Sequence, residues 1–151
     1  MWSPVEKTAL AEAEIEYHDH VSTTIFARFP IKKAPIEILD DYEIIIWTTT
    51  PWTMPGNRAV AYGQDIDYTL LEITSVSENS LAKIGDKIVV ATQLLEEVIK
   101  ELYILDFNVS KKLKGSEFEG SILAHPLNGY GYDHDVLLLA ADFVTTDQGT
   151  G

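Results

Sequence analysis

A threonine-rich segment is the part of this sequence best equipped for chemistry. Thr48, Thr49 and Thr50 follow an apolar run, and a loop with two prolines and a further threonine, Thr53, comes directly after them. A threonine hydroxyl can donate and accept hydrogen bonds, so several together can hold a polar substrate or a water molecule. Pro51 lacks an N–H group and therefore ends regular strand pairing. The pattern predicts a rigid loop at a strand end, which is a common place for a binding site.

Two indole side chains and one amide belong to the same segment. Trp47 and Trp52 could form the walls of a site or stack on a base, and a core or lid role fits each of them equally well. Asn57 can present both a donor and an acceptor to a substrate or a water molecule. The structural alternative is a threonine-rich sheet edge with a proline-fixed turn, and composition by itself slightly favours that alternative.

Histidine and aspartate form two weaker candidate clusters. Residues 18–20 read His-Asp-His and residues 133–135 read Asp-His-Asp. In a strand, positions two apart share a face, so His18 and His20 could share a zinc ion, yet no third ligand lies near them in the sequence. We expect solvated turns at both places and no metal. His125, which precedes a proline, is expected to be structural.

The composition excludes several other kinds of chemistry. The chain has no cysteine, which removes disulfides, cysteine-based zinc sites and a thiol nucleophile. No serine lies in a Gly-x-Ser-x-Gly pattern, so nothing predicts a covalent nucleophile. The formal net charge is −13, which argues against a free-standing nucleic-acid binder because phosphate contacts need lysine and arginine. An acidic domain can still contact one end of a nucleic acid when a larger body supplies the affinity.

Length and hydropathy are those of an ordinary globular protein. The 151 residues, 46% of them hydrophobic, suffice for one domain with a buried core. No apolar run approaches the length of a membrane span, and the N-terminus lacks the basic and apolar regions of a signal peptide. We expect a cytoplasmic protein that does not associate with a membrane.

The elements that must position the threonine segment are mostly strands. Apolar patterns bounded by turn residues predict eight short strands, at residues 14–18, 23–29, 42–49, 58–62, 68–73, 87–91, 107–113 and 136–144. Helical spacing of apolar residues predicts one helix at 93–103 with Thr92 as its N-cap, and a weaker helix is expected at 6–12. Eight strands at this spacing favour a mostly β (α+β) domain, built as a barrel or a tightly curled sheet.

The threonine segment belongs to a longer pattern. Residues 48–61 read Thr-Thr-Thr-Pro-Trp-Thr-Met-Pro-Gly-Asn-Arg-Ala-Val-Ala, which resembles the threonine-rich peptide in the editing domain of isoleucyl-tRNA synthetases. The valyl and leucyl enzymes resemble one another here in having Thr-Thr-Arg-Pro followed by an acidic residue, whereas this chain has Thr-Thr-Thr-Pro-Trp. The resemblance extends to residues 2–5, 8–17, 114–120, 125–127 and 147–151.

This resemblance implies a fold and a domain division. The fold would be a small closed β-barrel with peripheral helices, the editing-domain fold of class I synthetases. Residues 1–12 would be the linker from the catalytic domain, and residues 13–151 would be the editing domain. In the family, an aspartate that is understood to hold the substrate ammonium follows the Gly-Thr-Gly of residues 149–151. Because the chain stops at Gly151, we expect it to be truncated at this motif and only weakly active.

The resemblance also implies a reaction, the hydrolysis of valine misattached to tRNA(Ile), with valyl-adenylate as a further potential substrate. Water would attack the ester, and isoleucine would be excluded sterically. The site that attaches amino acids to tRNA separates valine from isoleucine poorly, because one methylene changes binding by only about 1–3 kcal/mol. This enzyme family is the usual example of that problem. The catalytic residues would be Thr48, Thr49, Thr50 and Asn57, and the substrate-binding residues would be Trp47, Trp52, Thr53, Gly149, Thr150 and Gly151.

The expected partners follow from the same resemblance. They are the 3′ end of tRNA(Ile) carrying valine and the rest of the synthetase chain, with no cofactor or metal in the editing domain and a monomeric fragment. Two alternatives stay open. The domain could be a non-catalytic module that binds a tRNA 3′ end or an aminoacyl-adenylate, or an interaction domain in which the threonine loop is merely structural.

Overall fold

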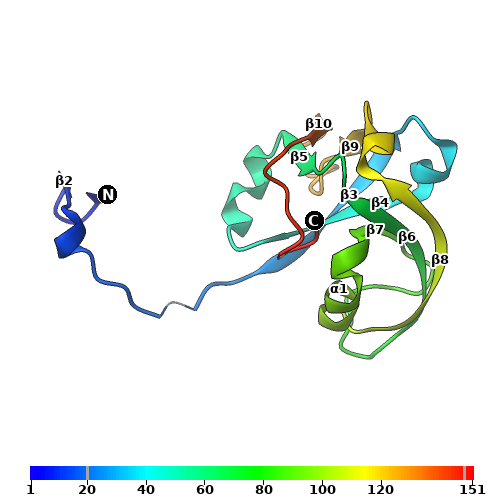
Figure 1. Ribbon diagram of the computed structural model, residues 1–151, viewed down its shortest axis with the longest axis horizontal. Helices are drawn as coiled ribbons and strands as arrows, with labels where there is room; N and C mark the ends of the chain where they lie inside the picture. The colour runs from blue at the N-terminus through cyan, green and yellow to red at the C-terminus, as the bar shows by residue number, and fades with distance from the viewer. Residues whose placement is uncertain (20, 148) are drawn as a thin grey trace.

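Strands make up most of the regular structure in the computed structural model, which describes residues 1–19, 21–147 and 149–151 (Figure 1). The η elements are short 3-10 helices. In chain order the elements are β1 (Trp2–Ser3), β2 (Thr8–Ala9), η1 (Glu12–Glu14), β3 (Ile25–Lys33), η2 (Glu37–Asp41), β4 (Glu43–Thr48), η3 (Pro51–Gly56), β5 (Ala59–Tyr62), β6 (Asp67–Val76), β7 (Lys87–Ala91), η4 (Thr92–Leu94), α1 (Leu95–Glu101), β8 (Ile104–Lys114), η5 (Gly115–Phe118), β9 (Ile122–Ala124) and β10 (Asp135–Ala140).

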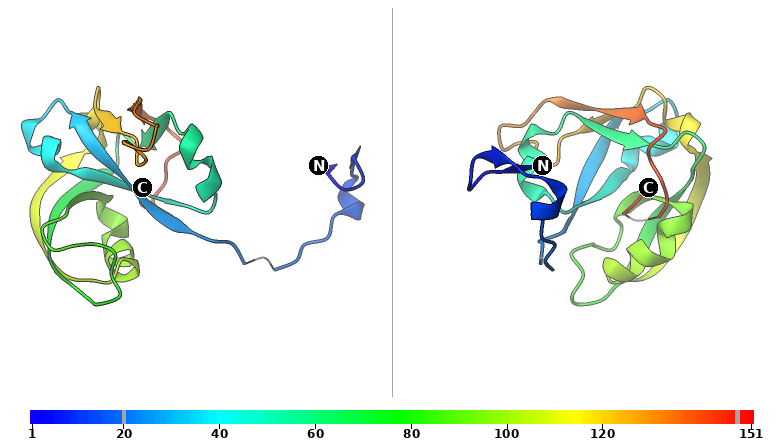
Figure 2. Two further views of the ribbon diagram at one scale, coloured as in Figure 1. Left: turned by 180° about the vertical axis from the view of Figure 1, so that it is seen from behind. Right: turned by 60° about the vertical axis from the view of Figure 1, so that its left-hand side comes forward.

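One sheet of eight strands forms the body of the protein. Its strands are hydrogen-bonded in the order β5-β10-β9-β3-β4-β7-β6-β8, and Figure 2 shows its strong curl from two further directions. Most neighbours are antiparallel, but β10 runs parallel to β5 and β4 runs parallel to β7. Thr48 lies opposite Ile25 and Trp47 lies opposite Phe26. The threonine segment therefore leaves the sheet where β4 ends, beside the start of β3.

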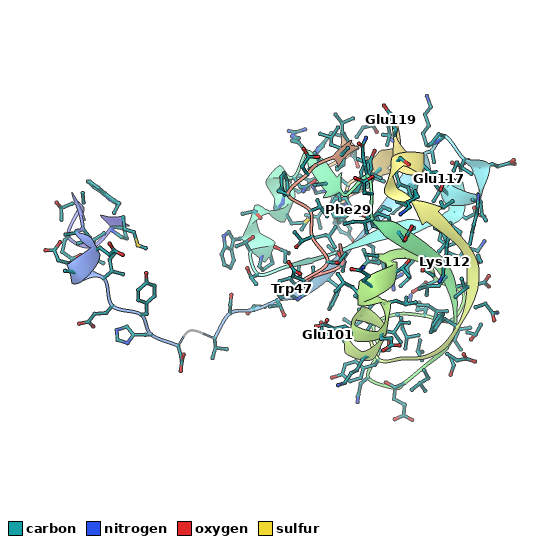
Figure 3. All side chains as sticks on the ribbon, viewed as in Figure 1. Phe29, Trp47, Glu101, Lys112, Glu117 and Glu119 are labelled. Atoms are coloured by element: carbon teal, nitrogen blue, oxygen red, sulfur yellow. The ribbon has the colours of Figure 1, made fainter. Side chains whose placement is uncertain are left out.

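The hydrophobic core lies inside the curl of the sheet. Phe29, Leu70, Leu123 and Val136 come from four different strands and are fully buried. Figure 3 shows Phe29 in the middle of the body. Val98 of α1 belongs to the same cluster of buried side chains, so the helix completes the core instead of standing apart from it. This core holds β3 and β4 in register, and it thereby sets the point from which the threonine segment starts.

The sheet is open, and the prediction of a closed barrel is wrong. Its end strands are β5 and β8, and they do not pair with each other in the part of the chain that the structure describes. Phe118, which follows β8, makes edge-to-face contacts with Tyr62 of β5 and Tyr68 of β6, with ring centroids 5.7 Å and 5.0 Å apart. Phe118 thus connects β5, one end strand, with β6, the neighbour of the other end strand, through side-chain packing and not through a ladder.

The helix predicted at residues 93–103 is present, but it is shorter than predicted and begins at a later residue. Its first predicted turn is the 3-10 helix η4, and α1 begins only at Leu95. Thr92 does not cap it. The Thr92 hydroxyl is hydrogen-bonded to the hydroxyl of Thr69 at 2.9 Å, because Thr69 is fully buried and needs a polar partner. No helix within the described ranges has the length and the apolar composition needed to cross a membrane.

The N-terminal residues form a small hairpin of β1 and β2, which Figure 1 shows away from the curled sheet. The predicted helix at 6–12 is wrong, because Lys7 adopts a positive φ of 56° in a turn and β2 follows it. The predicted strand at 14–18 is also wrong, because none of the strands in the described chain pairs with it. The division between a linker and an editing domain at residue 12 stays a prediction.

The other predicted strands are found with adjusted ends. β7 covers the predicted residues 87–91, whereas β10 ends at Ala140, four residues before the predicted end. The chain turns there, and the Ala141 N–H donates to the carbonyl of Tyr62 at 2.9 Å. The sequence pattern misses β9, a strand of only three residues.

Candidate functional site

The threonine loop, defined here as residues 47–57, begins where β4 leaves the sheet. Trp47 and Thr48 are the last residues of β4, and η3 forms the second half of the loop. Pro51 is the first residue of η3, a position that suits proline because an N–H group there would have no partner within the helix. The sequence prediction of an ordered loop at a strand end is therefore confirmed.

Three threonine hydroxyls in this loop form a connected cluster. Oγ1 of Thr50 lies 3.2 Å from Oγ1 of Thr48 and 3.4 Å from Oγ1 of Thr53. The Thr53 hydroxyl donates to the carbonyl oxygen of Thr50 at 2.8 Å, and the Thr50 N–H donates to Oγ1 of Thr48 at 3.1 Å. In the described part of the chain, these hydroxyls bond to one another and to the backbone.

The directions of these hydrogen bonds follow from counting hydrogens. A hydroxyl has one hydrogen and can accept twice. Thr53 uses its hydrogen on the Thr50 carbonyl, so it can only accept from Thr50, and Thr50 in turn can only accept from Thr48. All three hydroxyl hydrogens are donated within the loop, whereas the hydroxyl oxygens can each accept one more hydrogen bond. The cluster therefore suits groups that donate, such as an ammonium group, a ribose hydroxyl or a water molecule.

The remaining predicted side chains of the loop lie on its surface. The side chain of Thr49 is exposed, while its carbonyl accepts a hydrogen bond from the hydroxyl of Ser22 at 3.4 Å. Trp52 is 70% exposed, which rules out a core role for it in this structure. Trp47 is half-buried, and Figure 3 places it beside the C-terminal segment.

The Gly-Thr-Gly turn packs against this region. A Cβ on Gly149 would lie 4.0 Å from Cε3 of Trp47, so the turn is a neighbour of the threonine loop. The carbonyl of Thr150 accepts a hydrogen bond from the Ala91 N–H at 3.1 Å, and Thr150 itself is buried. Gly151 has φ 84° and touches Ala91 so closely that a Cβ there would lie 2.3 Å from the Cβ of Ala91. The role of residues 149–151 in substrate binding stays a prediction.

Asn57 uses its amide group within the loop. Its Nδ2 donates one of its two hydrogens to the carbonyl of Ala59 at 3.1 Å. Its Oδ1 is covered and has no hydrogen-bond partner in the described chain. The side chain is therefore oriented by the loop, and Oδ1 is the one atom of it that is left to accept a hydrogen bond.

Two histidines contact the threonine loop, and sequence reasoning missed this contact. His125 Nε2 lies 2.9 Å from the carbonyl oxygen of Met54, and His134 Nε2 lies 3.0 Å from that of Asn57. The prediction of a solvated turn at residues 133–135 is thus wrong for His134, which is half-buried against the loop. The only sequence signal was the place of His125 between a short apolar stretch and a proline, which indicates a structural role but names no partner.

The histidine and aspartate clusters give no sign of a metal site. His18 lies 3.2 Å from Glu16 on the exposed N-terminal segment, and His20 lies outside the described residues. Asp133 accepts a hydrogen bond from the Gly129 N–H at 2.6 Å. Within the described ranges, no three acidic or histidine side chains come together as metal ligands.

An ion-pair cluster joins β3 to the turn before β7. The guanidinium of Arg28 lies 2.5 Å from a carboxylate oxygen of Asp86 and 3.1 Å from one of Glu43. Partial burial by itself would raise the pKa of Asp86. The hydrogen bonds from Arg28 and from the Lys83 N–H outweigh burial, and the pKa of Asp86 is lowered from its ordinary value of 3.8.

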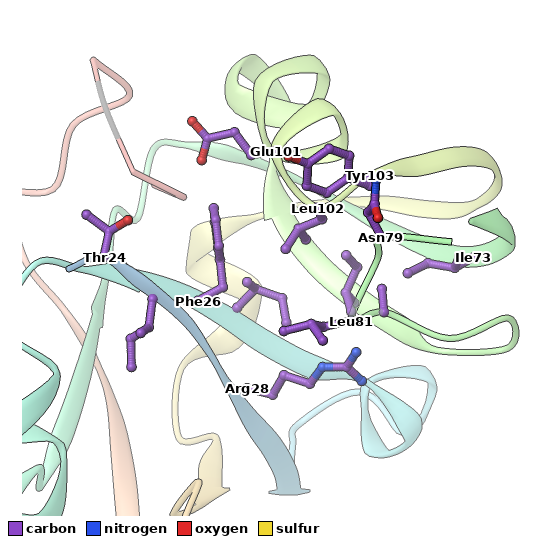
Figure 4. A pocket seen from close by; sticks show the side chains of 13 residues that line it. Thr24, Phe26, Arg28, Ile73, Asn79, Leu81, Glu101, Leu102 and Tyr103 are labelled. Atoms are coloured by element: carbon purple, nitrogen blue, oxygen red, sulfur yellow. The ribbon is translucent and has the colours of Figure 1, made fainter. Parts of the chain in front are cut away.

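A pocket of about 620 Å³ lies next to this ion-pair cluster, and Arg28 belongs to both (Figure 4). Phe26, Arg28, Glu101 and Tyr103 are among its lining residues, and none of the predicted site residues lines it in the described chain. Phe26 lies opposite Trp47 in the strand register, so the pocket adjoins the threonine loop along the sheet.

The fold is similar to that of a solved CP1 domain. The crystal structure of GlLeuRS-CP1 is similar to this chain with a TM-score of 0.61, over 85% of this chain and 52% of that chain. The sequence identity is 15%, so the likeness concerns the fold. The chain has the fold of a synthetase CP1 domain, with the threonine loop at the end of one of its inner strands.

Sequence relatives of known name match the whole chain. The isoleucine–tRNA ligases of Gluconobacter oxydans (strain 621H), Pelagibacter ubique (strain HTCC1062) and Caulobacter vibrioides are 53%, 50% and 46% identical to it, each over 100% of this chain. The chain therefore matches one segment of isoleucine–tRNA ligases over its full length. It spans 16% of the length of these three relatives. No family model matches the chain.

Proposed function

We propose that this chain is the editing domain of an isoleucine–tRNA ligase and that it hydrolyses valine misattached to tRNA(Ile). The full-length match to isoleucine–tRNA ligases and the CP1 fold support an editing role. The main observation behind the proposal is the cluster of Thr48, Thr50 and Thr53 hydroxyls. All three donate within the loop, and their oxygens can still accept hydrogen bonds from a ligand.

The proposed substrate offers donors that fit these acceptors. An aminoacyl-tRNA ends in an α-ammonium group beside the ester and in a ribose with one free hydroxyl, and both groups donate hydrogen bonds. Holding them at the cluster orients the ester relative to a bound water, and orientation of reactants is a large part of catalysis. Valyl-adenylate carries the same ammonium group, and we propose it as a second substrate.

The proposed reaction is attack of water on the ester. The water oxygen bonds to the carbonyl carbon, the bond from that carbon to the ribose oxygen breaks, and the ribose oxygen takes up a proton. Valine and free tRNA(Ile) are the products. The chain has no cysteine, and the hydroxyls of Thr48, Thr50 and Thr53 donate to neighbours in the loop, so we assign these three to binding and orientation and not to covalent attack.

Selectivity in this proposal comes from shape. The synthetic site of a ligase separates valine from isoleucine by one methylene, worth only about 1–3 kcal/mol. A second site that is too small for isoleucine can exclude it through overlap, which is much sharper than lost attraction. We place this exclusion beside Trp47 and the Gly-Thr-Gly turn, because these groups pack together next to the threonine cluster.

The partners proposed for this domain are the 3′ end of tRNA(Ile) and the rest of the ligase. The net charge of −13 gives the domain little attraction for phosphates. We therefore propose that the other domains supply most of the tRNA affinity and that this domain contacts the end that carries the amino acid.

Rates of deacylation test the proposal. Val-tRNA(Ile) and Ile-tRNA(Ile) are incubated with the 151-residue chain, and in parallel with the Gluconobacter oxydans ligase carrying this sequence in place of its matching segment. We expect faster loss of valine than of isoleucine in the chimera, by at least about 100-fold. Equal rates for the two substrates would refute the selectivity, and a chimera without hydrolysis would refute the editing function in favour of a binding module.

A further inference from the structure

Two imidazole rings from the connection between β9 and β10 hold the second half of the threonine loop. His125 directly follows β9, and His134 directly precedes β10. The Nε2 atoms of His125 and His134 lie 2.9 Å and 3.0 Å from the carbonyl oxygens of Met54 and Asn57. A carbonyl oxygen can only accept, so both Nε2 atoms carry a hydrogen and donate it.

The ring of His125 is fixed in one tautomer. Its Nδ1 accepts a hydrogen bond from the Leu127 N–H at 3.1 Å, so the hydrogen lies on Nε2 and the ring is neutral. The ring is 1% exposed and stacks on Tyr132 at a centroid distance of 5.5 Å. The His134 ring lies 4.8 Å from it. Neither histidine can turn away without losing both a hydrogen bond and ring packing.

Both donors act on the backbone that carries Asn57. The Met54 carbonyl accepts from His125 and also from the Asn57 N–H at 3.0 Å, while the Asn57 carbonyl accepts from His134. The Asn57 side chain is held through its Nδ2 by Ala59. Every hydrogen-bonding group of Asn57 except Oδ1 is therefore engaged.

We propose that His125 and His134 are positioning residues for the editing reaction, acting through Met54 and Asn57. The two imidazole donors set the path of the loop that carries Thr53 and Asn57. They do not touch the substrate in this proposal. The inference rests on the proposed editing function, but its structural half, that the donors hold the loop, can be tested without any substrate.

Paired substitutions separate the donor from the rest of the ring. In His125→Gln the amide nitrogen replaces Nε2 and can still donate to the Met54 carbonyl. In His125→Asn the shorter amide can replace Nδ1 and accept from the Leu127 N–H, but it cannot reach Met54. His134→Gln and His134→Asn form the same pair for the carbonyl of Asn57, and His18→Asn on the exposed N-terminal segment is the matched control.

Amide hydrogen exchange of the chain tests the structural half. Loss of one hydrogen bond changes a local opening equilibrium by about tenfold. We expect the amides of Thr53 and Asn57 to exchange about tenfold faster in the two Asn variants, and within about twofold of the unmodified chain in the Gln variants and in His18→Asn. Equal exchange in the Asn and Gln variants would overturn the inference, because ring packing and not the donor would then hold the loop.

Deacylation of Val-tRNA(Ile) by the chimeric ligase tests the catalytic half. We expect about tenfold slower turnover at saturating substrate in the Asn variants, with recovery in the Gln variants and an unchanged KM. Full activity in an Asn variant whose loop amides exchange faster would overturn the positioning role. If the unmodified chimera hydrolyses nothing, the proposed function fails, whereas the exchange comparison still decides whether the two histidines hold the loop.

Discussion

Thr53 closes the loop on Thr50 with two hydrogen bonds to one atom. The amide N–H and the hydroxyl of Thr53 both donate to the Thr50 carbonyl oxygen, at 3.0 Å and 2.8 Å. This arrangement commits the Thr53 hydrogen to the backbone and forces Thr50 to donate to Thr53. Local geometry thus decides that the cluster offers acceptors, which is the property on which the proposed binding of an ammonium group depends.

Replacing Thr50 tests the cluster directly. Thr50→Val keeps the branched shape and removes the hydroxyl, so we expect Val-tRNA(Ile) hydrolysis to slow by about 5- to 150-fold, the equivalent of about 1–3 kcal/mol. Single-turnover hydrolysis by the chimeric ligase is the measurement. Thr50→Ser, which keeps the hydroxyl, should stay within about threefold. Because Thr50 is exposed, the unfolding midpoint should not change, and a Val variant with full activity would remove Thr50 from the site.

Gly115 tests how closely two backbone segments approach. A Cβ there would lie 1.9 Å from the carbonyl oxygen of Gly63, which cannot move without breaking the turn before β6. We expect Gly115→Ala to lower the free energy of unfolding by about 3 kcal/mol. Gly56→Ala is the matched control, because a Cβ at Gly56 meets nothing within 4 Å. Denaturant titration of both variants is the measurement, and equal stability would show that the segments can separate.

Replacing Phe118 tests how much its ring packing against β5 and β6 stabilises the fold. It is 1% exposed and contacts Tyr62 and Tyr68, so we expect Phe118→Ala to cost about 3–5 kcal/mol of unfolding free energy. Phe143, which is 79% exposed, is the control, and Phe143→Ala should change stability by less than about 0.5 kcal/mol. Thermal and denaturant unfolding measure both. A small effect at Phe118 would mean that the contacts of this ring contribute little to stability.

The pH dependence of stability tests the ion pair of Asp86 with Arg28. A carboxyl whose pKa is lower in the folded than in the unfolded state stabilises the fold above its unfolded pKa, here 3.8, and this stabilisation is lost as the pH falls through the folded pKa. We expect Asp86→Asn to cost about 1 kcal/mol at neutral pH, since Arg28 is partly exposed. The difference from the unmodified chain should disappear as the pH falls below 3.8. A difference that persists at lower pH would contradict the assignment.

The strand pattern was predictable where burial alone decides it. β7 is found at the predicted residues because its side chains alternate between two covered faces, and this leaves a continuous apolar run in the sequence. The closed barrel was not predictable from strand count. Closure depends on whether the two end strands pair with each other, and β5 and β8 do not pair in the described chain.

Side-chain hydrogen bonds were predictable only when the partners are neighbours in the chain. Thr92 looks like an N-cap in the sequence, but the buried hydroxyl of Thr69, 23 residues earlier, takes its hydrogen bond. The segment 133–135 looks like a solvated turn, but His134 reaches the Asn57 carbonyl, 77 residues earlier.

The threonine loop could be predicted from the sequence, because its proline, its threonines and its turn lie within a few residues and interact through local backbone geometry. The resemblance to isoleucyl-tRNA synthetases could also be found there, since residue types in fixed order carry that information. The folded structure was needed to find the open sheet, the packing of the Gly-Thr-Gly turn on Trp47 and the two histidine donors on Met54 and Asn57. These contacts join residues far apart in the chain, and they depend on how whole strands pack around the core.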